Sequence, residues 1–216
     1  MRDRGERLLF IGSYLHPLGA DPNDARAAFA EYAGDRLWVT SHLTQLVGVV
    51  LMVAAILRVT RWLEAAGANV WARLAAAAAV ASLALAAALQ AVDGVALKRM
   101  VDAWAAAPAS EKDTAFRAAF AVRQVEIGLA AMASLLLGAT ATLSGLALRA
   151  DRAFPGWLGT IAILGGIPTL VAGVVIAYTG FSAPEMWINM PANSVLLVWM
   201  LVLGGSMWRR AEVGLR

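Results

Sequence analysis

The sequence lacks cysteine altogether and contains only two histidines, His16 and His42, among 216 residues. The missing thiols exclude disulfides, iron–sulfur clusters, thiolate-bound zinc and cysteine nucleophiles. Two histidines supply few ligands for zinc or haem, and we expect no metal site. Charged residues make up 15% of the chain, against about 25% in a typical soluble domain. This composition excludes a soluble globule, a disordered chain and a coiled coil.

What the chain has in abundance is apolar sequence. Hydrophobic residues make up 60%, and the mean hydropathy is +0.67. Most runs reach the roughly 20 residues that a helix needs to cross a bilayer, and the shorter last run gains length if its helix begins near Met186. We predict an all-α integral membrane helical bundle of about five transmembrane helices, at 38–57, 74–92, 127–148, 157–179 and 192–208.

The chain divides into an N-terminal interfacial segment, residues 1–36, and a transmembrane bundle, residues 37–210. Asp21 followed by Pro22 is typical of a helix start and Gly34 of a helix end, so we predict a short amphipathic helix between them. We expect this helix to lie on the membrane surface or to cover the mouth of the bundle as a lid. The apolar run Leu8–Leu15 is too short to span a bilayer.

The second and third spans continue past the membrane as a protruding helical hairpin at about 93–126. The chain turns only at Pro108–Ala109, and Ser110 with Asp113 resembles a capping box for the helix that follows. We expect the aromatic side chains of the hairpin to cover one another, the lid or a partner. Farther along, small residues recur every four positions and predict a close helix contact: Ala130, Ser134, Gly138 and Thr142.

Charge predicts the orientation. The first-to-second and third-to-fourth connections, together with the C-terminus, hold eight arginines and three acidic residues, a net charge of +5, and the rest of the chain carries −2. The positive-inside rule places that side, with the C-terminus, in the cytoplasm. Because the basic residues flank apolar runs, they indicate membrane topology and no nucleic acid. Abundant alanine and arginine are typical of a GC-rich bacterial genome, so we expect a bacterial inner membrane.

Ionisable residues are absent from the middle of every predicted span, which argues against an ion or proton path. Polar residues gather at the outer end instead. Counted from the hairpin turn, Asp93 lies level with Arg123 and Glu126, and Gln90 lies one turn below Asp93. We expect an Asp93–Arg123 ion pair, with Glu126 as a competitor. The predicted ligand-binding residues are His42, Gln45, Gln90, Asp93, Arg123 and Glu126.

Two interpretations of this cluster stay open at this point. It can be a pocket beneath the lid for a lipid-like, quinone or pigment ligand, or a structural salt bridge that pins two long helices. We expect a non-enzymatic accessory or ligand-binding subunit, which contacts membrane lipid and belongs to a larger membrane protein complex. The alternative is a small membrane enzyme acting on an amphiphile at the outer leaflet through His42 with Asp93 or Glu126. We assign no catalytic residue, and the sequence specifies no cofactor.

Three phrases of the sequence resemble a group of uncharacterised bacterial multi-pass membrane proteins with no assigned activity. They are AVDGVALKRMVDAWAAAP at 91–108, FPGWLG at 154–159 and AYTGFS at 177–182. The resemblance covers roughly residues 35–210. It implies the helical bundle and no particular reaction.

Overall fold

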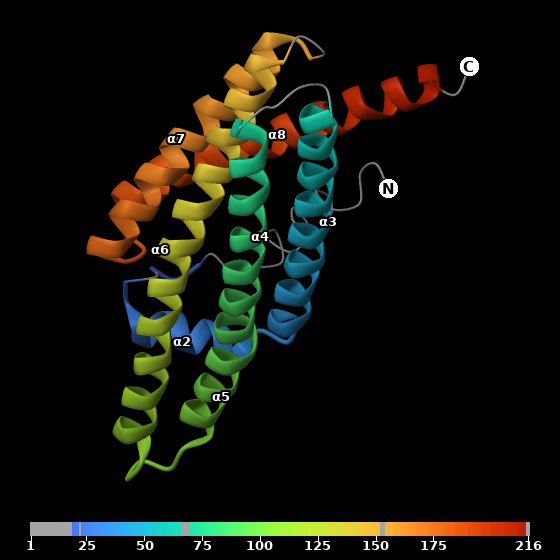
Figure 1. The fold of residues 1–216 in the computed structure, drawn as a ribbon. Helices are drawn as coiled ribbons and strands as arrows, with labels where there is room; N and C mark the ends of the chain where they lie inside the picture. Colours follow the sequence, from blue (N-terminus) through green and yellow to red (C-terminus); the bar gives the residue numbers. More distant parts are fainter. Residues whose placement is uncertain (1–18, 22, 66–69, 152–153, 215–216) are drawn as a thin grey trace.

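The computed structural model describes residues 19–21, 23–65, 70–151 and 154–214. All regular secondary structure in this part is helical (Figure 1). The elements, in chain order, are α2 (Ala25–Gly34), α3 (Trp38–Ala65), α4 (Val70–Gln90), the π-helix η1 (Ala91–Leu97), α5 (Lys98–Ala106), α6 (Lys112–Ala150), α7 (Gly156–Thr179) and α8 (Ala183–Gly214).

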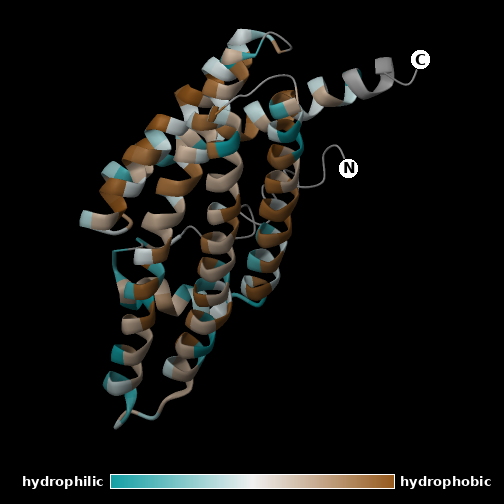
Figure 2. Cartoon of the chain, in the orientation of Figure 1, coloured by the Kyte–Doolittle hydropathy of each residue, from teal (hydrophilic) through white to brown (hydrophobic). Residues whose placement is uncertain are grey.

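Five of these helices are long and apolar enough to cross a membrane: α3, the continuous α4–η1–α5 helix, α6, α7 and α8. The predicted all-α membrane bundle with a short N-terminal helix is therefore confirmed. Figure 2 shows apolar residues along the middle of α3 and α7, and hydrophilic residues on α2 and near the hairpin turn. Residues 1–18, which include Leu8–Leu15 and His16, lie outside the described residues.

Helices that follow one another in the chain pack side by side, so α4 packs between α3 and α6, and α7 packs between α6 and α8. The α5–α6 hairpin extends beyond the other helices, and α2 lies across its base (Figure 1). We call this the α2-covered end. The main hydrophobic core lies toward the opposite end, where α3, α6, α7 and α8 contribute Ile56, Leu148, Leu158 and Trp199.

Two of the predicted helix starts are wrong. The Asp24 carboxylate, not that of Asp21, caps α2, accepting hydrogen bonds from the Arg26 and Ala27 main-chain N–H groups. Asp21 instead closes its own turn by accepting from the N–H of Asn23. At the hairpin, α6 begins after Glu111 without a side-chain cap, so Ser110 does not start a capping box. The predicted helix end at Gly34 and the predicted turn at Pro108–Ala109 are confirmed, because α2 ends at Gly34 and the turn lies between the end of α5 and the start of α6.

The α6–α7 interface is built from residues with little or no side chain. A methyl group added to Gly138 would lie 2.5 Å from the Leu170 main-chain nitrogen, and one added to Gly145 would lie 2.5 Å from the Gly159 carbonyl oxygen. Gly138 and Thr142 of the predicted small-residue face do contact α7. The glycine contacts, however, recur every seven residues and pair Gly145 with Gly159, Gly138 with Gly166 and Ala131 with Gly173. Seven-residue spacing is typical of left-handed helix packing. We call this interface the glycine seam.

Candidate functional site

The α2-covered end is held together by aromatic side chains. Phe29 of α2 is fully buried, and its ring centroid lies 6.1 Å from that of Trp104 and 5.7 Å from that of Phe116. Trp104 and Phe116 also contact each other. The expectation that the hairpin aromatics cover one another and the lid is therefore confirmed for these two. Phe120 stacks on Phe116, with ring centroids 6.0 Å apart, but stays 42% exposed. The lid is a packed part of the molecule.

Polar contacts fix the lid at both of its ends. Lys98 of α5 donates from Nζ to the main-chain oxygens of Tyr32 and Ala33, at 3.0 and 3.1 Å. A cation at a helix C-terminus satisfies its free carbonyls and complements the helix dipole. Near the other end of α2, Arg26 pairs with Asp113 of the hairpin at 3.1 Å, in an exposed position. These contacts place α2 over the junction of α3, η1 and α6.

The π-helix η1 carries Asp93 and contacts α3 closely. A methyl group added to Gly94 would lie 2.5 Å from Cβ of His42, so only glycine allows this approach. The Trp38 indole Nε1 donates to the Asp93 main-chain oxygen at 3.0 Å. Trp38 and His42 lie one helical turn apart on α3. Together they hold Asp93 of η1 by its main-chain oxygen and its side chain. Short π-helical segments inside α-helices are frequent at functional sites.

His42 is 2% exposed, and both of its ring nitrogens face acceptors. Nδ1 lies 2.7 Å from the Trp38 main-chain oxygen, and Nε2 lies 2.9 Å from Oδ2 of Asp93. A carbonyl oxygen can only accept, so Nδ1 carries a hydrogen. The second proton lies in the His42–Asp93 hydrogen bond. The imidazole therefore has no free nitrogen with which to bind a metal or take a proton from a substrate.

Arg123 and Glu126 form a second buried pair on α6. Arg123 Nη1 donates to both Glu126 carboxylate oxygens, at 3.1 and 3.0 Å. The guanidinium also lies over the rings of Tyr32 and Phe181, 5.6 and 5.0 Å from their centroids. The predicted Asp93–Arg123 pair is wrong, because Asp93 pairs with His42 and Arg123 with Glu126. Because Asp93 and Glu126 lie at the same height, Arg123 could pair with either carboxylate. Here His42 on α3 reaches Asp93, and Arg123 pairs with Glu126.

Two acceptor atoms in the cluster receive no hydrogen bond from the described residues. Gln90 Nε2 donates to Oε1 of Gln45 at 3.2 Å, but Oε1 of Gln90 is buried without a donor. Oδ1 of Asp93 is likewise buried without a donor, although the Asp93 side chain as a whole is 16% exposed. Leaving such an acceptor unsatisfied costs about 1–3 kcal/mol, and more for a charged group. The two oxygens are therefore positions at which a donor would bind favourably.

Tyr32 connects the lid to the charged pairs. Its ring centroid lies 4.2 Å from that of Trp38. Burial raises the pKa of the Tyr32 hydroxyl above its usual value, and the adjacent Arg123 opposes this by favouring the ionised form. Glu126 and Asp93 are also close enough to raise that pKa. Tyr32 is consequently a neutral side chain at physiological pH, lying between the His42–Asp93 and Arg123–Glu126 pairs.

The structure brings the six predicted residues to one end of the bundle, in three contacts: His42–Asp93, Arg123–Glu126 and Gln45–Gln90. Sequence reasoning missed Trp38, Tyr32, Lys98 and Phe181. Trp38 stands at the start of the first apolar run, and nothing in the sequence indicates that its indole reaches η1. Lys98 also pairs with Asp102 four residues on, and that local spacing gives no sign of its bonds to main-chain oxygens 65 and 66 residues earlier.

Comparison of the chain with protein-family models, curated proteins and solved structures found no match. The fold and the site therefore rest on the residues described above.

Proposed function

We propose that this chain is a non-enzymatic, membrane-embedded binding subunit that holds the polar head of an amphiphile beneath α2. The observation that carries the proposal is a pair of buried acceptors that receive no hydrogen bond from the part of the chain that the structure describes, Oδ1 of Asp93 and Oε1 of Gln90. Both belong to the α4–η1 helix, three residues apart. Asp93 also bonds to an imidazole whose orientation is fixed from two sides.

The chemistry of these acceptors selects the ligand class. A carboxylate oxygen and an amide oxygen accept hydrogen bonds from hydroxyl or ammonium groups. A lipid headgroup with an ammonium or hydroxyl group, a quinol and a hydroxylated pigment all present such donors next to an apolar body. We favour a lipid-like ligand, because the site lies at one end of the spans, at the depth where headgroups are found. A bound quinol or a bound hydroxylated pigment would be a different outcome of the experiment below.

A binding role fits the site better than catalysis. The enzyme alternative uses His42 with Asp93 or Glu126 as acid and base. Both nitrogens of His42 are engaged, and both carboxylate oxygens of Glu126 accept from Arg123. General acid–base work needs a group that can reach the substrate proton directly or through one water. The His42 ring and the Glu126 carboxylate, with their polar atoms engaged, instead hold a fixed geometry around Oδ1 of Asp93, the acceptor left for a ligand.

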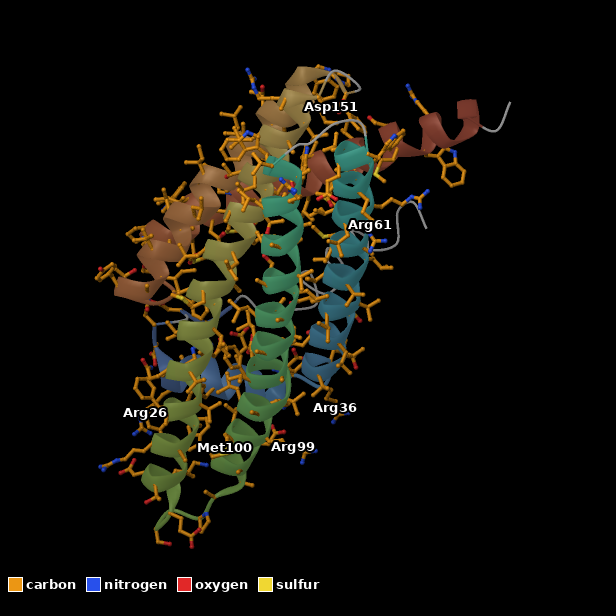
Figure 3. The ribbon with its side chains drawn as sticks, in the orientation of Figure 1. Arg26, Arg36, Arg61, Arg99, Met100 and Asp151 are labelled. Atoms are coloured by element: carbon orange, nitrogen blue, oxygen red, sulfur yellow. The ribbon has the colours of Figure 1, made fainter. Side chains whose placement is uncertain are left out.

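We further propose that the protein lies in a bacterial inner membrane with the α2-covered end outside and the C-terminus in the cytoplasm. Figure 3 shows Arg61 and Asp151 toward one end of the bundle and Arg26, Arg36 and Arg99 near the other. The support is the +5 charge at the Arg61 end. Cysteines at Ala109 and Ala150, in this cysteine-free chain, test it. An impermeant thiol reagent on intact cells should label position 109 alone, and labelling only at 150 overturns the orientation.

The ligand is tested by native mass spectrometry and absorption spectroscopy after extraction in a mild detergent. We expect a stoichiometric amphiphile on the parent protein, lost in Gln90→Leu. This variant removes one unpartnered acceptor and leaves the His42–Asp93 pair intact. The matched control Asp113→Asn changes a carboxylate that is 78% exposed and should retain the ligand.

The mass of the companion identifies its class, and visible absorption distinguishes a pigment from a lipid. A co-purifying protein subunit in place of a small molecule would support the accessory role within a complex and refute the ligand. A ligand-free protein that turns over a lipid, with activity lost in a folded His42→Ala variant, would overturn the proposal in favour of the enzyme.

A further inference from the structure

Toward the end of the bundle opposite the α2-covered end, α3, α6 and α8 line a small cavity of about 10 Å³. Five of its lining residues are aliphatic. The other three carry polar atoms and come one from each helix: Thr60, Ser144 and Trp199. This cavity has no residue in common with the proposed ligand site.

Two of the three polar groups have no hydrogen-bond partner among the described residues. They are the hydroxyl of Ser144 and the indole Nε1 of Trp199, and both atoms are buried. Trp199 is 2% exposed. An indole N–H can only donate, and nothing in a hydrocarbon environment can accept from it. Both groups therefore need a partner that the cavity itself must hold.

Ser144 differs from its neighbours on α6. Thr140 and Thr142 each donate to the main-chain oxygen four residues earlier, at 2.8 Å, which is the usual arrangement for a hydroxyl in a membrane helix. Ser144 makes no such bond. Its hydroxyl is therefore available to a group in the cavity, as are the lone pairs of Thr60, whose proton is donated to the Leu57 oxygen at 3.0 Å.

We propose that the cavity binds one ordered water molecule that bridges α3, α6 and α8. The volume matches the about 10–15 Å³ that one water requires, and a buried water needs two to four polar partners. The water accepts from the Trp199 N–H and donates to the oxygens of Ser144 and Thr60. The surrounding aliphatic side chains exclude a charged ligand. The bridge connects α8 to α3 and α6, whose main chains approach that of α8 less closely than the main chain of α7 does.

Stability measurements distinguish a bridged cavity from a dry one by the sign of the effect. If water bridges the helices, Ser144→Ala should lower the folding equilibrium constant in detergent about tenfold. If the cavity is dry, the same variant removes an unsatisfied hydroxyl and should be neutral or stabilising, which would overturn the proposal. Ser206→Ala is the matched control, because that hydroxyl already donates to the Val202 oxygen within α8. It should change the constant by less than about twofold.

A second measurement observes the indole directly. The ¹⁵N-indole resonance of Trp199, assigned by its loss in Trp199→Phe, should show cross-relaxation with a water molecule in a water-selective experiment. The signal should persist in Ser144→Ala, because the water keeps Trp199 and Thr60 as partners. Absence of water contact in the parent overturns the proposal. Loss of water contact in Ser144→Ala also overturns it, because the parent signal would then have been relayed by the Ser144 hydroxyl.

Discussion

The α2-covered end and the glycine seam hold helices together by opposite means. At the α2-covered end, aromatic rings, two charged pairs and a lysine fill the space between elements, and side-chain atoms make the contacts. Along the glycine seam, main-chain atoms of α6 and α7 approach so closely that an added methyl group would lie within 3 Å of them. The first region is sensitive to lost groups, and the second to added ones.

The largest effect should come from removing a charge at the α2-covered end. Asp93→Ala leaves the buried Nε2–H of His42 without an acceptor, and breaking a buried pair in this way costs about 3–5 kcal/mol. Reversible unfolding in detergent measures this. The double variant His42→Ala/Asp93→Ala should recover part of the loss. A loss below about 1 kcal/mol, typical of an exposed pair, would contradict the buried pair.

A smaller effect should come from adding one methyl group to the glycine seam. Gly138→Ala forces α6 and α7 apart, and such overpacking costs about 1–3 kcal/mol. Gly128→Ala on the same helix is the control, because a methyl group there meets nothing within 4 Å. That control should gain up to about 1 kcal/mol from helix propensity. Equal behaviour of the two variants in a melting experiment would refute backbone contact as the organising feature of the seam.

The smallest effect should come from the exposed pair that joins the lid to the hairpin. Arg26→Ala removes the contact with Asp113 and the cation above the Phe116 ring, 4.2 Å from its centroid. Both partners are more than half exposed, so we expect about 0–1 kcal/mol. High salt should weaken the contact in the parent as well. A loss as large as that in Asp93→Ala would show that the lid depends on this pair more than on its aromatic side chains.

Sequence patterns predicted the features that are set by composition and by local signals. Runs of apolar residues located the five spans, Gly34 the end of α2, and Pro108 the hairpin turn, after which equal counting placed Asp93 level with Arg123 and Glu126. These inferences need only the rise per residue of an α-helix and the position of the hairpin turn. The structure confirms the spans and the turn. The six predicted site residues lie together for the same reason.

The rest depends on how separate elements meet. In the π-helix at 91–97 each main-chain hydrogen bond reaches one residue farther along the chain than in an α-helix. No feature of the composition marks this segment. The choice of His42 over Arg123 as the partner of Asp93 depends on which helix approaches η1, and Gly94 decides that approach. The seven-residue seam becomes visible only when Gly138 and Gly145 are aligned with Gly166 and Gly159. Each helix alone displays small residues at several spacings.

The two lysines of the chain have a practical consequence. Lys98 donates to the last turn of α2 and Lys112 to the Ala105 oxygen near the end of α5, so each of the only two side-chain amines in the sequence is occupied. Lys98 is 12% exposed. An amine-directed acylating reagent should therefore modify Lys98 only when α2 detaches. The rate at which Lys98 is acylated, measured by mass spectrometry of its peptide, would therefore report how often α2 detaches. The measurement needs no engineered residue in the protein.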